Sequence, residues 1–156
     1  NKNQPVIDEV LKNYKKQFLN CIEDYVSPIN STISFIKNYN GHQKIVLASM
    51  NTKDIIFKVL KKFSMIDKFD LILSRDDVAH HKPDPEIYTK ASQELNLPPE
   101  ECSVIEDSVV GASAAIGAGM KCYVLLNTFN KKVQFLNVNI EAFIRTRKDL
   151  DKHFRT

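Results

Sequence analysis

Two adjacent carboxylates, Glu106 and Asp107, follow a short apolar segment, residues 103–105, that has the length and residue types of a buried strand. Ser108 is a residue type that caps helices, and we expect a helix of small residues from there to Gly119. Paired carboxylates at such a turn offer hard oxygen ligands for Mg²⁺. The same acids would also favour a helix N-terminus without any metal. Alone, the segment predicts either a metal site or a capped turn.

A second turn between a strand and a helix carries groups that suit a phosphate. The apolar run over residues 44–49 predicts a strand, and a helix should follow with Asn51 as its cap. The Ser49 hydroxyl and the backbone N–H groups of Met50 and Asn51 are placed to hold a phosphate at the positive end of that helix. An ordinary turn residue is the alternative interpretation of Ser49.

Lys82 stands in the most polar stretch of the chain and is followed by Pro83. The residue before a proline is disfavoured in a helix, so we expect an extended loop to display Lys82. Its ammonium would neutralise a phosphate or a neighbouring carboxylate, and an ordinary surface lysine is the alternative. We expect His80 and His81 to be loop residues rather than metal ligands, because no third soft ligand lies at a useful spacing.

Helices and strands that would carry these residues alternate along the chain. Helices are predicted over residues 5–26, 31–40, 51–63, 84–95, 108–119 and 148–154, and strands over residues 44–49, 70–74, 103–105, 122–126 and 142–144. The alternation predicts the α/β class, with a three-layer, doubly wound parallel sheet. Right-handed crossovers would bring the C-terminal ends of the strands to one rim, where ligands bind in such folds. Ser49 and the Glu106–Asp107 pair should therefore share that rim.

Composition narrows the class of protein. The 156 residues, 43% of them hydrophobic, are about the size of one domain. The net charge of +3 comes from scattered lysines, so we expect no nucleic-acid partner. No run approaches the ~18 apolar residues that cross a bilayer, so we expect no membrane segment. Three cysteines without a CxxC pair speak against zinc or a disulfide framework and predict a reducing, cytoplasmic compartment.

Three segments, read together, resemble motifs of a known superfamily. VLASMN, KPDPEIY and VIEDSVVGASAAIGAGM are similar to the second, third and fourth motifs of the haloacid dehalogenase-like (HAD) hydrolases, nearest to the β-phosphoglucomutase-like phosphatases and phosphomutases. The resemblance covers residues 28–126. It implies a HAD-like Rossmannoid core over residues 28–156, and residues 1–27 resemble the last helices of the helical cap domain in this branch.

The resemblance implies a role for each candidate residue. Phosphate would be bound by four residues, namely Ser49, Met50, Asn51 and Lys82. Lys82 and Ser49 would also act in catalysis, Lys82 by steadying the nucleophile and the phosphate charge. Glu106 and Asp107 would hold Mg²⁺, with Asp107 as the direct ligand. The implied reaction is Mg²⁺-dependent hydrolysis of a small phosphomonoester, such as a sugar phosphate, through an aspartyl-phosphate.

One family motif has no counterpart in this chain. The first motif, Asp-x-Asp-Gly-Thr, supplies the nucleophile and the acid–base group in the family, and it occurs nowhere in the sequence. In the family its strand lies between the strands that here end at Ser49 and at Glu106, so two strand edges should face a gap. We therefore expect the chain to be part of a longer protein, with the missing N-terminal segment as its partner, and to be inactive alone.

Other functions within the same family stay open. The main alternative is a non-catalytic, HAD-like binding or regulatory module that has lost the first motif. A phosphomutase is also possible by sequence, since the cap that would distinguish it is mostly absent. A haloacid dehalogenase is less expected, because that chemistry needs no Mg²⁺ and leaves Glu106 and Asp107 without a purpose. The sequence does not identify the substrate beyond a small phosphorylated metabolite.

Overall fold

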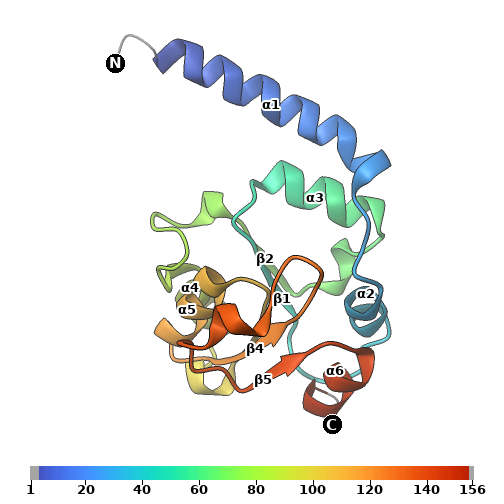
Figure 1. The fold of residues 1–156 in the computed structure, drawn as a ribbon, viewed down its shortest axis with the longest axis vertical. Helices are drawn as coiled ribbons and strands as arrows, with labels where there is room; N and C mark the ends of the chain where they lie inside the picture. The colour runs from blue at the N-terminus through green and yellow to red at the C-terminus, as the bar shows by residue number, and fades with distance from the viewer. Residues whose placement is uncertain (1–3, 155–156) are drawn as a thin grey trace.

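The computed structural model describes residues 4–154 and has an α/β architecture (Figure 1). The strands are β1 (Val46–Ala48), β2 (Leu71–Leu73), β3 (Ser103–Glu106), β4 (Lys121–Leu125) and β5 (Ala142–Ile144). The α-helices are α1 (Gln4–Tyr25), α2 (Asn30–Lys37), α3 (Lys53–Lys62), α4 (Glu86–Leu95), α5 (Val109–Gly117) and α6 (Arg147–Phe154). Short 3₁₀-helices are η1 (Ile66–Lys68), η2 (Arg75–Asp77), η3 (Pro99–Glu101) and η4 (Lys132–Phe135). Every predicted helix and strand is present, with ends shifted by a few residues.

All strand pairs are parallel, but the sheet is in two parts. One part has the order β1-β2 and the other has the order β3-β4-β5. Val46 pairs with Leu71 in the first part, and Val104 pairs with Cys122 in the second. Within residues 4–154 no backbone ladder joins β1 to β3, so each has one edge without a strand neighbour. This break lies where the sequence predicted a gap.

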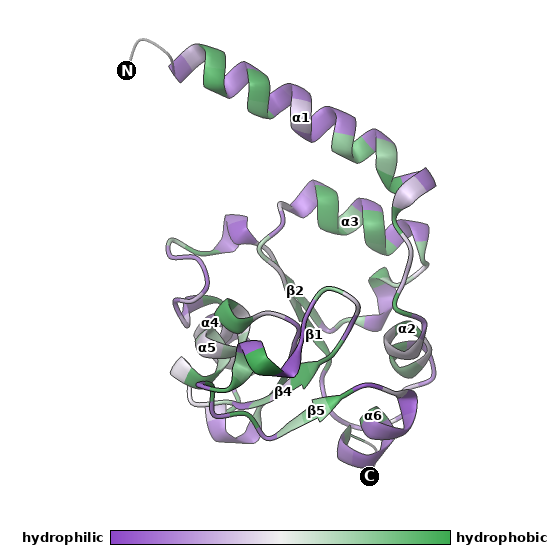
Figure 2. Ribbon diagram, viewed as in Figure 1, coloured by the Kyte–Doolittle hydropathy of each residue, from purple (hydrophilic) through white to green (hydrophobic). Residues whose placement is uncertain are grey.

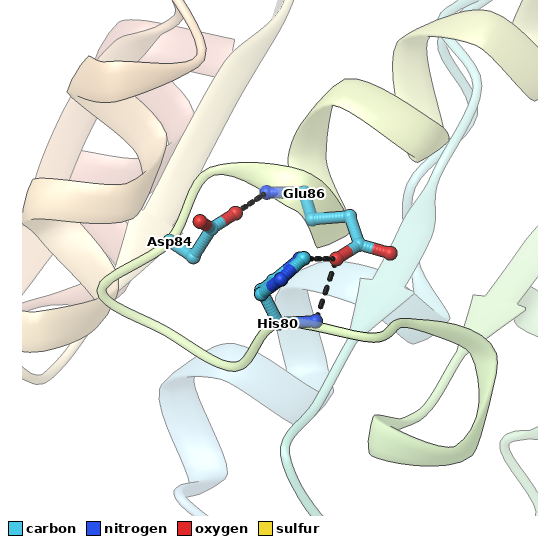
Figure 3. A group of neighbouring side chains, drawn as sticks. All are labelled: His80, Asp84 and Glu86. Carbon is cyan, nitrogen blue, oxygen red and sulfur yellow. Dashed lines mark hydrogen bonds and ion pairs between the residues drawn. The ribbon is translucent and has the colours of Figure 1, made fainter.

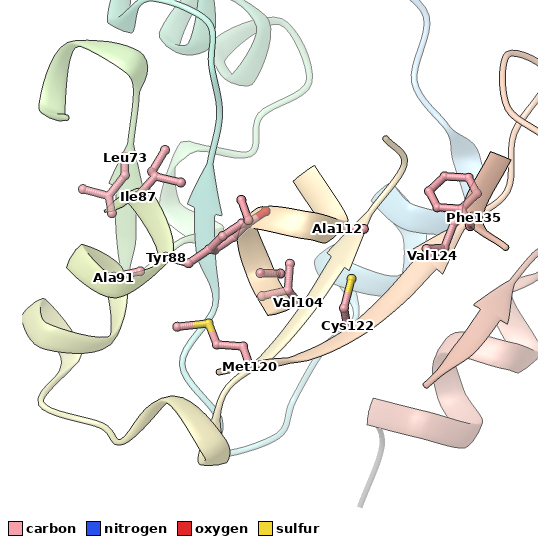
Figure 4. Packing of buried hydrophobic residues seen from close by; sticks show 12 residues of the cluster. Leu73, Ile87, Tyr88, Ala91, Val104, Ala112, Met120, Cys122, Val124 and Phe135 are labelled. Atoms are coloured by element: carbon pink, nitrogen blue, oxygen red, sulfur yellow. The ribbon is translucent and has the colours of Figure 1, made fainter. Parts of the chain in front are cut away.

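Side chains alternate between the two faces of the sheet, as extended chains require. On β4, Cys122 and Val124 pack in a cluster with α4 and α5, whereas Leu125 packs against α2 and α6. On β2, Leu73 joins the first cluster and Ile72 lies against α3. Figure 4 shows the first cluster, which includes Leu73, Ile87, Tyr88, Ala91, Val104, Ala112, Met120, Cys122, Val124 and Phe135. The predicted three layers are confirmed.

Local chemistry explains how α5 is placed behind the rim. The Ser108 hydroxyl accepts a hydrogen bond from the Gly111 N–H at 3.1 Å and so caps the helix, as predicted. Three alanines of α5, Ala112, Ala114 and Ala115, are completely buried, which brings the helix backbone close to the sheet. Beyond the helix Gly119 has φ +79°, a left-handed conformation that glycine adopts without strain.

Helix α1 extends beyond the body of the fold, above α3 in Figure 1. Its apolar residues recur with helical spacing, but Ile22 is its one buried residue among those described. Figure 2 shows the hydrophobic stripes along this helix. The exposed large apolar residues are Val6, Ile7, Val10, Leu11, Tyr14, Phe18 and Tyr25. Within the described part of the chain, no helix combines the length and apolar character needed to cross a membrane.

Candidate active site

The C-terminal ends of β1 and β3 are joined by the side chain of Lys82. Its Nζ donates to the carbonyl oxygen of Ala48, the last residue of β1, at 3.2 Å. It also pairs with Glu106 Oε1, at the end of β3, at 2.5 Å. The side chains of Lys82 and Glu106 are 8% and 9% exposed, so this ion pair is buried. A buried cation therefore spans the gap in the sheet at its rim.

Tyr88 completes this buried group, and the sequence did not point to its role. Its hydroxyl donates to Glu106 Oε1 and accepts from Lys82 Nζ at 2.9 Å. Burial, followed by the negative charge of Glu106, raises the pKa of Tyr88 far above its ordinary value, so the phenol stays protonated. Tyr88 lies on the buried face of α4. The available signal was that a buried tyrosine hydroxyl needs a partner.

The two adjacent carboxylates have different environments. Glu106 is engaged on both oxygens, because Oε2 accepts from the Ser108 hydroxyl at 3.2 Å. Asp107 is exposed, and its Oδ2 accepts from Asn127 Nδ2 at 3.3 Å. Asn130 Nδ2 donates to the backbone carbonyl of Asp107 at 2.7 Å. Asp107 is therefore an accessible carboxylate on a braced backbone, and Glu106 is committed to Lys82.

Asn127 and Asn130 were not identified from the sequence. They lie in the loop after β4, and Asn130 Nδ2 also donates to the Leu125 carbonyl at 2.9 Å. The Asn127 N–H donates to Asn130 Oδ1 at 3.0 Å, which ties the loop together. An Asn-x-x-Asn pattern directly after a predicted strand was the only signal, and it is equally common in ordinary turns.

Ser49 follows β1 and is half-buried. Its Oγ accepts from the backbone N–H of Asn51 at 3.2 Å and lies 3.5 Å from Asn51 Nδ2. The expectation that Asn51 caps the next helix is wrong, because α3 begins at Lys53 and Thr52 occupies the N-cap position. The reason is that both nitrogens of Asn51 are directed toward the Ser49 hydroxyl. Ser49, Met50 and Asn51 thus form a short loop between β1 and α3.

A second group of potential ligands comprises His80 and Asp84, in the loop before α4, and Glu86, the first residue of that helix (Figure 3). Their ligand atoms lie within 4.8 Å of one another. The Glu86 carboxylate accepts from the N–H groups of Ala79 at 2.8 Å and His80 at 2.6 Å, and these bonds lower the pKa of Glu86. Asp84 Oδ1 accepts from the Glu86 N–H at 2.9 Å. The group closes the loop that carries Lys82.

Of the six residues predicted for the site, Lys82 and Glu106 are in direct contact, and Asp107 directly follows Glu106 in the sequence. The other three, Ser49, Met50 and Asn51, follow the residue whose carbonyl binds Lys82. The arrangement places a cation, an accessible carboxylate, a hydroxyl and backbone N–H groups at one edge of the sheet. Such a set can bind an anion beside a divalent cation.

Known proteins resemble this chain in sequence. A family model described as haloacid dehalogenase-like hydrolase matches residues 1–125. The chain is 34% identical over 98 residues to beta-phosphoglucomutase of Bacillus subtilis (strain 168). This match covers 63% of the chain and 42% of that protein. It is 29% identical over 97 residues to fructose-1-phosphate phosphatase YqaB of Escherichia coli (strain K12). This match covers 62% of the chain and 51% of that protein. The matched part spans about half the length of these relatives.

The fold also has solved counterparts. A variant of CbbY from Rhodobacter sphaeroides, in complex with xylulose-(1,5)bisphosphate, superposes with a TM-score of 0.77 at 24% sequence identity. The match covers 92% of this chain and 65% of that chain. The two chains share the fold.

Proposed function

Because this chain belongs to the haloacid dehalogenase-like hydrolases, in the branch of phosphatases and phosphomutases, we propose that it supplies the phosphate-binding and metal-binding residues of a phosphatase. The observation that carries the proposal is the buried Lys82–Glu106 pair, which spans the sheet gap beside the exposed Asp107. The substrate would be a small phosphomonoester, and the names of the two relatives favour a sugar phosphate.

Mg²⁺ would be held at the rim by Asp107, with Glu106 as the adjacent carboxylate. Oxygen ligands from carboxylates suit this ion, and the exposure of Asp107 leaves room for the waters that it retains. Asn127 and Asn130 would keep the Asp107 ligand in place. When bound, Mg²⁺ would neutralise charge on the phosphoryl oxygens.

Residues of the loop after β1 would orient the phosphoryl group. The Ser49 hydroxyl and the N–H groups of Met50 and Asn51 would donate hydrogen bonds to its oxygens, and the Asn51 N–H would exchange its present acceptor, Ser49 Oγ, for the phosphate. Lys82, whose side chain is buried, would contribute a positive charge that is shielded from solvent. A fixed cation of this kind stabilises charge that develops in the transition state.

The nucleophile would be a carboxylate on a strand that enters the gap between β1 and β3. The free edges of both strands offer N–H and C=O groups to a parallel strand. Lys82 crosses the gap where such a strand would end, so the new carboxylate would replace Glu106 as its partner and leave Glu106 to the metal. Attack on phosphorus would form an aspartyl-phosphate and break the ester P–O bond. A second acid would protonate the leaving alcohol, and water would then release phosphate.

The test uses the longer protein that also carries the Asp-x-Asp strand, with p-nitrophenyl phosphate as substrate. We expect turnover in Mg²⁺ that disappears on chelation and returns when Mg²⁺ is restored. Asp107→Asn should lower kcat by at least about 100-fold, since it removes a metal ligand. The matched control is Asp67→Asn, which changes an exposed carboxylate in η1, outside the candidate site, and should leave kcat unchanged. Full activity without metal would contradict the proposal.

The 156 residues alone should be inactive, because they contain no Asp-x-Asp-Gly-Thr segment. A synthetic peptide with the sequence of that strand, added to the 156 residues, should bind in the gap and restore measurable turnover. We also expect the protein in the cytoplasm, where its three free cysteines would stay reduced.

A non-catalytic binding or regulatory module is the second candidate. The full engagement of the Glu106 carboxylate favours it, since Lys82 and Tyr88 occupy one oxygen and Ser108 the other, so neither is free for a metal. Such a module would bind inorganic phosphate in a calorimetric titration but would show no turnover in Mg²⁺, even with the Asp-x-Asp strand present. Product analysis with a sugar monophosphate would separate hydrolysis from phosphoryl migration in a mutase.

A further inference from the structure

Lys62, the last residue of α3, binds the C-terminal end of α1. Its Nζ donates to the backbone carbonyls of Ile22 at 2.9 Å, Glu23 at 2.5 Å and Val26 at 2.8 Å. The last carbonyls of a helix lack a full set of partners within the helix, and an ammonium has three protons to give. All three protons of Lys62 are therefore used, and its charge lies at the negative end of the α1 dipole.

Other contacts hold α1 only weakly to the body. Ile22 is its one buried residue among those described. An open surface hollow of about 560 Å³ adjoins the joint. The hollow is lined by Glu23, Phe57, Lys58, Lys61, Lys62 and Ile66. Lys15 pairs with Asp54 at 2.9 Å, but both side chains are more than 40% exposed, at 43% and 45%, and exposed ion pairs contribute little.

Helix α3 connects this joint to the candidate phosphate loop. The loop Ser49–Asn51 lies just before the start of α3, and Lys62 lies at its end. Through the Lys15–Asp54 pair, α1 also crosses the first turn of α3, beside that loop. Helix α3 therefore contacts α1 at both of its ends and adjoins the phosphate loop at its first.

We propose that Lys62 is a positioning residue that fixes the direction in which α1 leaves the α/β body, and with it the place of α1 beside the first turn of α3, next to the phosphate loop. The effect on substrate binding rests on the proposed function. The part about the direction of α1 does not, because it follows from the contacts of Lys62 alone.

Hydrogen exchange of the 156-residue chain tests the structural part. In Lys62→Met, amides of residues 18–26 should exchange about tenfold faster or more, because three charge-assisted hydrogen bonds are lost. Amides of β3 and β4 should be unchanged. Lys61→Met is the matched control, since Lys61 lines the same hollow and no described bond joins it to α1. Lys62→Arg, which retains donors, should recover most of the protection. If Lys62→Met does not fold, Lys62→Gln, with one amide donor, replaces it.

Equal exchange in the Lys62 and Lys61 variants would overturn the proposal, as would faster exchange spread evenly over α1, β3 and β4. In the longer protein, Lys62→Met should raise KM for p-nitrophenyl phosphate about tenfold with kcat nearly constant, because Lys62 touches no reacting group. A fall in kcat with constant KM would refute the positioning role. If the wild-type longer protein shows no turnover, the proposed function fails, and the exchange experiment still decides the role of Lys62.

Discussion

Gly111 lies in the third position of α5, directly beneath the Glu106 carboxylate. A Cβ atom at this position would lie well inside 3.0 Å of all three atoms of that carboxylate, a separation that real Cβ atoms do not adopt. The carboxylate would have to move, yet it is buried and bound to Lys82, Tyr88 and Ser108. Gly111→Ala should therefore destabilise the protein, although alanine is the better helix former.

The magnitude follows from two opposing contributions. Replacing glycine by alanine inside a helix stabilises it by about 1 kcal/mol. Separating a buried ion pair costs about 3–5 kcal/mol, because Lys82 at 8% exposure would be left without its carboxylate. The free energy of unfolding should thus fall by about 2–4 kcal/mol. With an m-value of about 2 kcal/mol/M, the urea midpoint should fall by about 1–2 M.

Urea unfolding of Gly111→Ala beside matched variants measures this effect. Gly117→Ala is the control, since a Cβ there would meet Pro85 at 3.6–3.9 Å, an ordinary contact, and it should leave the midpoint unchanged or slightly raised. In a Glu106→Ala background, Gly111→Ala should lose its penalty, because no carboxylate remains to be displaced. A Gly111→Ala protein as stable as the wild type would refute the reasoning, as would an equal loss in the Glu106→Ala background.

Two further predictions concern titration and reactivity. Burial would raise the pKa of Asp77, but hydrogen bonds, chiefly from Lys53, lower it from 3.8 to about 2. The folded state therefore binds this proton less readily than the unfolded state, so the stabilisation is present above about pH 4 and is lost as the pH falls toward 2. Urea midpoints measured between pH 5 and 2 should decline less steeply in Asp77→Asn, and parallel curves would contradict this. Cys122 is 1% exposed and burial raises its pKa to about 12, whereas Cys21 is exposed and Cys102 is partly exposed with a raised pKa. Ellman's reagent at pH 8, with labelled peptides identified by mass spectrometry, should modify Cys21 first, Cys102 more slowly and Cys122 only after unfolding; early labelling of Cys122 would contradict its burial.

Sequence patterns predicted correctly those features that depend on residues close together in the chain. The Ser108 cap, the helix of small residues after it and the alternation of strands and helices depend on spacings of a few residues. The expected cap at Asn51 failed for a reason that is also local but subtler. Two acceptable caps, Asn51 and Thr52, stand side by side, and the hydroxyl of Ser49 competes for the Asn51 side chain.

Contacts between residues far apart in the chain could not be predicted from sequence patterns. Lys62 binds carbonyls 36–40 residues earlier in the chain, and backbone carbonyls are the same at every position. Asn127 reaches Asp107 across 20 residues. Their residue types carry no mark of a partner, so only the packing of helices and strands could bring these groups together.

The sequence by itself determined the α/β class, the order of its elements and the family, because these depend on periodicity and on short motifs. It also determined that Ser49 and the carboxylates at residues 106–107 belong near one rim, since parallel strands with right-handed crossovers end on the same side. Only the tertiary structure decided how the two carboxylates divide their roles. Glu106 is buried against Lys82 and Tyr88 while Asp107 faces solvent, because successive residues at a strand end point in opposite directions.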